Sequence, residues 1–449
     1  MSQYFSDQLQ RLQETAALSE WAFRRDALDI FHTYGLPRRK QDPWKYVDNS
    51  ALLNLPLSGS DGDELAAPAS RPLSPEKKVH KTPEAPAKCG TDEEITFCFH
   101  NEILDWNNGK PSAARSLDIE NDCNLHPAQW HLDKDSLLAE ENGYSLINAF
   151  SFSQAYELNF SRCFEDYDAD SQPVVRLCFH GTQTYQAPRL YIKIPPGREI
   201  YLLIDSRELS SAVYWNPYFY FSLGENASLT LLERGPRLLD RLETSGQSPH
   251  VRSLTLRGQV RSGARLNSAF FYWGMALAIH DARFAISGTN AAVQMRGICF
   301  GEGQSRYHLR CENQHFAADS RSQCLYKNVL FDRSVSEFYG IIHADHRGVG
   351  TDAQQNNRNL LLSDQARVIA RPQLEILVDD LQCRHGSSTG SIDVEELFYM
   401  RSRGLNQNEA MRMAVVGFVE EISTYFRPEL LAALGIEDCL HALLHKRNR

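Results

Sequence analysis

Two residues with metal-binding side chains lie close together near the C-terminal end of the sequence. Cys383 and His385 are separated by one residue and are followed by the small, polar run Gly386–Gly390. Thiolate and imidazole groups are both good ligands for iron and zinc, so this pair could form half of a metal site. A Cys–His pair can equally pack without binding a metal. Chemistry alone therefore leaves both interpretations open.

Other groupings of reactive residues are weaker. His343 and His346 are three positions apart, and we interpret them as solvated side chains in a turn. Asp379 and Asp380 are adjacent, so on a strand they would point to opposite faces and could not share one substrate. The sequence contains neither a G-x-x-x-x-G-K-[ST] phosphate-binding motif nor an H-E-x-x-H zinc motif. We therefore predict no catalytic residues and no enzymatic activity.

Composition narrows the class of protein. The 449 residues carry a net charge of −10 and have a pI near 5.9, which argues against a nucleic-acid-binding protein. The ten cysteines show no C-x-x-C spacing, which argues against a zinc finger and against a complete four-cysteine cluster within this chain. The N-terminus lacks an apolar signal region, and the longest apolar run, Ala269–Ile279, is too short to cross a membrane. We expect a cytoplasmic protein with reduced, mostly buried thiols.

The two ends of the chain have helical patterns. Residues 1–55 are predicted to form an N-terminal helical domain, with one apolar face made by Phe23, Ala27, Ile30 and Tyr34. Residues 56–93 are rich in Pro, Ala, Ser, Lys and Asp without apolar periodicity, which predicts a flexible linker. Residues 381–449 are predicted to form a C-terminal helical domain. Its second helix has an apolar face comprising Met411, Ala414, Val415, Phe418, Ile422 and Tyr425.

The region between these ends, residues 94–380, has short apolar runs of strand length separated by polar turns. Several turns share a small or acidic residue followed by a small apolar one, at 224–227, 262–264, 288–291, 332–335 and 363–366. This texture is typical of a β-solenoid, in which each strand stacks on its counterpart one coil below. A sandwich or jelly roll is the main structural alternative. The open ends of a solenoid invite strand pairing with another chain.

The residues around Cys383 carry a family resemblance. Within Gln354–Gly404 the sequence reads N-R-N-L-L-L-S, P-Q-L-E-I, D-D, C-R-H-G, G-S-I-D and L-F-Y-M-R-S-R-G, in that order. This run resembles the C-terminal signature of the SufB/SufD family, the scaffold subunits of the SUF iron–sulfur cluster assembly machinery. C-R-H-G followed by T-G-S-I-D, together with the G-L-P-x-R-K-x-x-x-W-K-Y pattern at Gly35–Tyr46, resembles the SufD branch.

The resemblance implies a right-handed parallel β-helix core between N- and C-terminal helical domains. It implies a non-enzymatic scaffold subunit that pairs with a SufB-like subunit through the β-helix, or with itself when alone. His385 would be a ligand to a transient iron–sulfur cluster shared with that partner, and Cys383 would lie at the same interface. The family also implies a reduced flavin within the complex, with no cofactor tightly bound to the isolated chain.

A second partner is implied for the C-terminal helices, which would bind a SufC-like ABC ATPase. The residues expected at that contact are Leu397, Phe398, Arg401, Arg403 and Phe418. The two arginines, next to Gly404, could instead complement a helix dipole. Two alternative functions remain: a SufB-type subunit that nucleates the cluster itself, and a stand-alone β-solenoid protein or enzyme acting on its own ligand.

Overall fold

We describe the fold from a computed structural model of the chain. The described residues are 22–37, 44–55, 94–100, 103–105, 114–116, 142–152, 155–160, 174–181, 184–208, 214–234 and 250–426. Three predicted segments lie outside these residues: the first part of the N-terminal helical domain at 1–21, the linker at 56–93 and the helical segment after 426.

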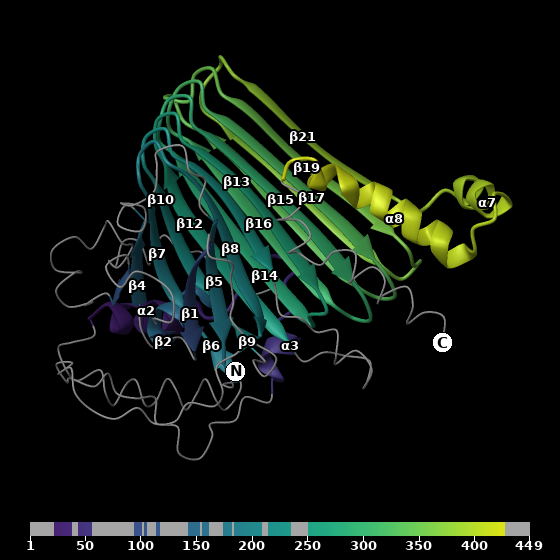
Figure 1. Cartoon of the computed structure of the whole chain (residues 1–449), viewed down its shortest axis with the longest axis horizontal. Coiled ribbons are helices and arrows are strands. Elements are labelled where there is room, and N and C mark those ends of the chain that lie inside the picture. Colours follow the sequence, from purple (N-terminus) through teal and green to yellow (C-terminus); the bar gives the residue numbers. More distant parts are fainter. Residues whose placement is uncertain are drawn as a thin grey trace.

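The core is a parallel β-solenoid of about seven turns, which confirms the fold class predicted from the sequence (Figure 1). Each turn contributes one strand to each of two facing sheets. Sheet A has the order β2 (Ile103–Asp105), β1 (Glu94–His100), β5 (Val174–His180), β8 (Glu199–Glu208), β11 (Ser228–Arg234), β13 (Arg265–Trp273), β15 (Ala292–Gly301), β17 (Arg321–Leu330), β19 (Asp352–Leu361) and β21 (Gln382–Gly390).

Sheet B runs alongside, and its strands alternate in sequence with those of sheet A. Its order is β20 (Arg367–Ile376), β18 (Val335–Ala344), β16 (Arg306–His315), β14 (Leu277–Ile286), β12 (Val251–Val260), β10 (Tyr218–Leu223), β7 (Arg189–Ile194), β4 (Ala155–Asn159) and β3 (Ala114–Ser116). A small side pair, β6 (Tyr185–Gln186) and β9 (Tyr214–Trp215), joins it at β12. The described pairings are parallel except β1 with β2 and β3 with β4.

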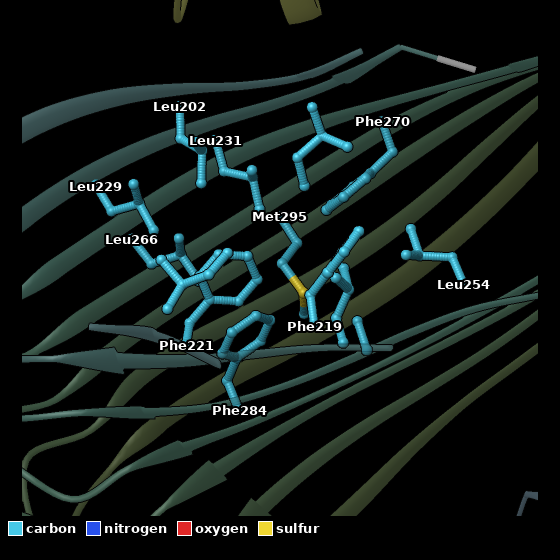
Figure 2. Packing of buried hydrophobic residues seen from close by; sticks show 14 of the residues in the cluster. Leu202, Phe219, Phe221, Leu229, Leu231, Leu254, Leu266, Phe270, Phe284 and Met295 are labelled. Atoms are coloured by element: carbon cyan, nitrogen blue, oxygen red, sulfur yellow. The ribbon is translucent and has the colours of Figure 1, made fainter. Parts of the chain in front are cut away.

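Successive coils stack in register, so a residue lies above the residue one coil earlier on the same face of its sheet. In the middle coils this offset is 29 positions, as between His308 and Glu337 on the ten-residue strands β16 and β18. Because side chains alternate between the two faces of a strand, one row from each strand enters the interior. Figure 2 shows these apolar side chains, including Leu231, Phe270 and Met295, packed between the sheets.

The predicted turns supply left-handed backbone conformations where the chain passes between sheets. Asn226, Asn290 and Asp332 have φ of 57°, 58° and 49°, and Gly263 has φ of 67°. The turns stack as the strands do: Asn226 donates its backbone N–H to Ser262 O at 2.8 Å. A Cβ at Gly263 would lie only 2.1 Å from Asn226 Oδ1, so this turn has room only for glycine.

Helices cover the outer faces of both sheets. α2 (Ala22–Tyr34), the short α3 (Ser50–Leu53) and α6 (Gly143–Ser151) cover the early strands of sheet B, and the Phe31 and Phe150 rings meet edge to face at 5.4 Å. On the predicted face of α2, Phe23, Ala27 and Ile30 are buried, but Tyr34 at the helix end is 58% exposed.

The transition to the C-terminal helices comes later than the predicted boundary at residue 380. β21 continues sheet A to Gly390, because the residues around Cys383 follow the same backbone ladder as β19. α7 (Val394–Ser402) and α8 (Gln407–Ser423) then follow. α8 lies along the outer face of sheet A, and α7 projects beyond it (Figure 1).

Candidate functional site at the open end of the solenoid

Cys383 and His385 lie on β21, the last strand of sheet A. The register pairs Cys383 with Ala353 and His385 with Gln355 on β19. Ala353 and Gln355 are buried in the interior, and aligned residues of parallel strands share a face. The Cys383 and His385 side chains therefore line the end of the interior, where Cys383 is half-buried and His385 is exposed.

The last coil, made of β20 and β21, is not covered by another strand within the described part of the chain. We call this coil the open end. β20 is in register with the interior row of β18, which places Val368, Ala370, Pro372, Leu374 and Ile376 toward the open end. These side chains are half-buried or exposed, whereas the aligned Phe338 and Ile342 one coil below are buried. The open end thus combines an apolar row from β20 with a polar row from β21.

The surroundings of Cys383 oppose its ionisation. Burial and the nearby Asp352 carboxylate raise the pKa of the Cys383 thiol above its ordinary value. The thiolate is the form that binds metals and attacks electrophiles. Because metal binding can displace the proton, Cys383 is suited to ligation only once a cation or a positively charged partner group arrives.

A polar interior lies directly beneath the open end. Asn359 donates its amide hydrogens to Ser388 O at 3.0 Å and to Thr389 Oγ1 at 3.3 Å, and it accepts a 2.6 Å bond from Asn328. Asn357 accepts a further bond from Asn359 at 2.8 Å. Asn359 of the N-R-N motif thus holds β21, the strand that carries Cys383 and His385, and Asn357 of the same motif supports Asn359.

Gln355 links the two sheets one coil below His385. Its amide donates to Gly340 O at 3.3 Å and to Gln373 O at 3.0 Å, so it crosses the interior from sheet A to sheet B. A Cβ at Gly340 would lie 2.3 Å from Gln355 Oε1, so only glycine leaves room for this crossing. The floor of the open end is therefore held by a hydrogen-bonded side chain.

A cluster of thiols, phenols and an imidazole lies deeper in the interior. His280 is fully buried and hydrogen-bonded on both ring nitrogens, to Tyr272 Oη at 2.6 Å and to Tyr326 Oη at 2.8 Å. Burial raises the pKa of Cys324 well above its ordinary value. Burial also opposes ionisation of Cys311, but hydrogen bonds with Cys324 and His280 outweigh it and lower the pKa of Cys311 to about 6.

Sequence reasoning missed this interior cluster. Its members come from β13, β14, β16 and β17, and no local spacing links them. The sequence contains one relevant feature: polar residues interrupt rows of otherwise apolar interior side chains. This feature can be recognised only once the register of the strands is known.

The weaker candidates are not brought together into a reactive group. His343 Nδ1 is 3.2 Å from Glu375 Oε2, and His346 Nδ1 is 3.2 Å from Leu377 O. Gly386–Gly390 matches the letters of the hydrolase motif G-x-S-x-G around Ser388. That motif works at a sharp strand-to-helix turn, whereas Ser388 lies within strand β21.

The C-terminal helices carry the remaining predicted site residues. α8 begins with a capping box, in which Asn406 and Glu409 form both bonds. Glu421 fastens α8 to sheet A through Lys327 at 2.7 Å and Arg358, the arginine of the N-R-N motif, at 2.5 Å. Phe418 faces the sheet, and its ring lies 4.9 Å from Lys327 Nζ.

α7 is different, because none of its residues is buried. Phe398 is 71% exposed and Leu397 is half-buried. Arg401 and Arg403 are exposed, and the Arg403 guanidinium lies 5.1 Å from the centre of the Tyr399 ring. The predicted residues thus form two surfaces, the open end with Cys383 and His385 and the exposed helix α7, while Phe418 packs between α8 and sheet A.

The fold and site define a β-solenoid protein that presents a thiol and an imidazole, Cys383 and His385, at an open strand edge. Residues 177–418 match the family model described as the SUF system FeS cluster assembly, SufBD core domain. The chain belongs to this family of iron–sulfur cluster assembly proteins, which confirms the resemblance seen in the sequence.

Individual relatives agree with this assignment. The iron–sulfur cluster assembly protein SufD of Escherichia coli is 33% identical over 59% of this chain and 67% of its own length. A SufBD family iron–sulfur cluster assembly protein of Synechocystis is 30% identical over 89% of this chain and 86% of its own length. SufD of Bacillus subtilis is 28% identical over 44% of each chain.

Proposed function

We propose that this chain is the SufD-like, non-enzymatic scaffold subunit of an iron–sulfur cluster assembly complex. The observation that carries the proposal is the last coil, which no other strand covers within the described residues and which presents Cys383 and His385 beside exposed strand edges. Such edges can extend a sheet into a second chain. A SufB-like subunit would continue the solenoid here, and a second copy of this chain would do so when that subunit is absent.

The transient cluster is the cargo of this interface. Iron–sulfur clusters are held by about four protein ligands, mainly thiolates. Cys383 and His385 supply two ligand groups, so the partner would supply the rest. An imidazole ligand in place of a thiolate weakens the hold on the iron, which suits a cluster that must be passed on. A reduced flavin would act within the same complex, and the isolated chain would hold no cofactor tightly.

The second proposed contact is with a SufC-like ABC ATPase, which would carry out the ATP hydrolysis. The exposed Phe398 and Tyr399 on α7 are suited to anchor in a groove, with Arg401 and Arg403 beside them. Phe398→Asp should abolish retention of the ATPase in a pull-down. The matched change Met413→Asp, at an exposed position on α8, should reduce retention less.

The complex is proposed to work in the cytoplasm. No helix among the described residues is long and apolar enough to cross a membrane.

The proposal is tested by co-expression with a SufB-type subunit and a SufC-type ATPase. Wild type, His385→Ala and His32→Ala, a change at an exposed position on α2, are purified through a tag on this chain. Complex mass, iron and acid-labile sulfide are then measured. We expect all three to assemble, with only His385→Ala losing most of the bound iron and sulfide.

Other outcomes separate the parts of the proposal. If the complex forms and His385→Ala keeps its iron and sulfide, the scaffold function stands and the ligand assignment fails. If neither partner is retained by wild type, the scaffold function itself is wrong. If wild type alone reconstitutes a stable cluster, a subunit that nucleates the cluster itself is the better description.

A further inference from the structure

Two Cys-Phe-His sequences lie at the end of sheet A opposite to Cys383 and His385. Residues 98–100 on β1 and 178–180 on β5 both read Cys-Phe-His. The two strands are adjacent and parallel, and their register pairs Cys98 with Cys178 and His100 with His180. The fold therefore stacks two copies of the same tripeptide, although they lie far apart in the sequence.

The cysteines and His180 share the outer face of the sheet. Phe99 and Phe179 point into the interior, where their rings stack with centroids 4.9 Å apart. Alternation along the strands then places Cys98, Cys178 and His180 on the opposite face. Cys178 is only 3% exposed, and Cys98 and His180 are half-buried, so the group is sheltered from bulk water.

The ligand atoms are close enough to share one ion. One ligand atom from each of Cys98, Cys178 and His180 lies within 4.8 Å of the other two. Tetrahedral zinc, with bonds of about 2.0–2.3 Å, separates its ligand atoms by roughly 3.3–3.8 Å. Small side-chain rotations would close the remaining difference. Within the described ranges, no other three His, Cys, Asp or Glu side chains meet this criterion.

We propose that Cys98, Cys178 and His180 bind a zinc-class divalent cation that fastens β1 to the solenoid. Two thiolates balance the charge of the ion, and such a neutral site is compatible with a sheltered position. Structural zinc takes four ligands. The fourth ligand is water. The site is separate from the open end and does not depend on the proposed cluster or partners.

The test uses the isolated full-length chain, loaded with zinc under reducing conditions and freed of excess metal by gel filtration. We expect about one zinc per wild-type chain, and at least a tenfold lower occupancy at micromolar zinc in Cys178→Ser and in Cys98→Ser. Cys383→Ser is the matched control, because it removes the other Cys-x-His cysteine and should keep the zinc.

Cobalt substitution gives a readout of the ligands themselves. Wild type with Co²⁺ should show a thiolate-to-cobalt charge-transfer band, which weakens in Cys98→Ser and disappears in the double serine variant. Far-ultraviolet circular dichroism checks that each variant is folded. Should Cys178 prove essential for folding, the half-buried Cys98 gives the deciding variant.

Three results would overturn the proposal. One is wild type that takes up no more zinc than the folded double variant. Another is zinc that follows Cys383 instead of Cys98 and Cys178. The third is a Cys98–Cys178 disulfide in protein purified under reducing conditions, found by mass spectrometry of unreduced peptides.

Discussion

At the residue scale, the chemistry of the open end depends on the burial and the charged neighbours of its polar side chains. Cys383 is kept protonated by burial and by the charge of Asp352, whose carboxylate also lies 3.8 Å from the Arg384 guanidinium. The reactivity of this cysteine is therefore set by its neighbours.

Asp352→Asn should make Cys383 more reactive. Removing the carboxylate lowers the pKa of the thiol, so more thiolate is present at pH 8. We expect alkylation by iodoacetamide to be severalfold faster, because the rate follows the fraction of thiolate. The rate is measured by mass spectrometry of the Cys383 peptide, with Asp379→Asn as the control at an exposed position. Equal rates in both variants would show that burial alone controls Cys383.

A second residue-scale prediction concerns the fully buried Asp281. Its carboxylate accepts bonds from Arg257 and from Asn142, the N-cap of α6, both at 2.8 Å. Asp281→Asn leaves the buried Arg257 charge without its counter-ion, which typically costs about 3–5 kcal/mol. Urea unfolding at pH 7 should show this loss, whereas Asp364→Asn, on an exposed turn, should change little.

The same residue predicts a pH dependence. Burial alone would raise the pKa of Asp281, but Arg257, Arg310 and Arg283 outweigh it and hold the pKa far below its ordinary value. Its contribution to stability is therefore complete above the unfolded pKa of about 4 and is lost progressively as the pH falls below that value. Unfolding free energies measured between pH 5 and pH 2.5 should fall less steeply in Asp281→Asn than in wild type.

At the element scale, α8 is positioned by an apolar face and by one carboxylate. The residues buried against sheet A are Val415, Val419, Ile422 and Phe426. The predicted face shared Val415 and Ile422 with this set, but Tyr425 is 41% exposed. Periodicity predicted the helix correctly, whereas the orientation of the face depends on the sheet it meets, which the pattern does not contain.

Glu421→Gln should loosen α8 selectively. Burial opposes the charge of Glu421, but Lys327, Arg358 and Arg296 outweigh it and lower the pKa of this carboxyl, so it is ionised at neutral pH. Because the side chain is 37% exposed, solvent screening keeps the effect on global stability small. Hydrogen exchange should quicken several-fold across residues 407–423 and stay unchanged in β15. The exposed Glu420→Gln is the matched control, and equal exchange in the two variants would contradict the prediction.

At the scale of the whole molecule, the two ends of the solenoid differ. Helices cover the early strands of sheet B, whereas the last coil presents an apolar row and a polar row. Leu374 is 37% exposed there, while the aligned Ile342 one coil below is 1% exposed. A partner that continued the sheet would bury Leu374 in the same way.

Leu374→Lys should therefore weaken association without unfolding the chain. Burying an unpaired ammonium group at an interface costs at least 1.4 kcal/mol, which corresponds to about tenfold or more in Kd. Analytical ultracentrifugation of this chain, alone and with a SufB-type subunit, measures the effect. Val349→Lys places the same charge on an exposed turn and should associate normally. Unchanged association of Leu374→Lys would place the interface elsewhere.

The sequence predicted the solenoid because its strands are short and its turns carry residues such as Asn226 and Asn290, which tolerate a left-handed backbone. It also placed Cys383 and His385 close together, because they are neighbours in the chain, and their role as cluster ligands stays a prediction. It could not predict the grouping of His280 with Cys311, or of Cys98 with Cys178. Those groupings depend on which strands stack and in which register, a property of the coil that no local spacing records.

The in-register stacking of strands from successive coils constrains how this protein can change in length. One extra residue inside a strand would turn the rest of that strand over, exposing its interior row and breaking the match with both neighbouring coils. Insertion or deletion of a complete coil would instead leave every remaining contact with an equivalent neighbour. Evolution or engineering can therefore lengthen the body in whole coils and keep its open end intact, so that the reach of the molecule and its binding chemistry vary independently.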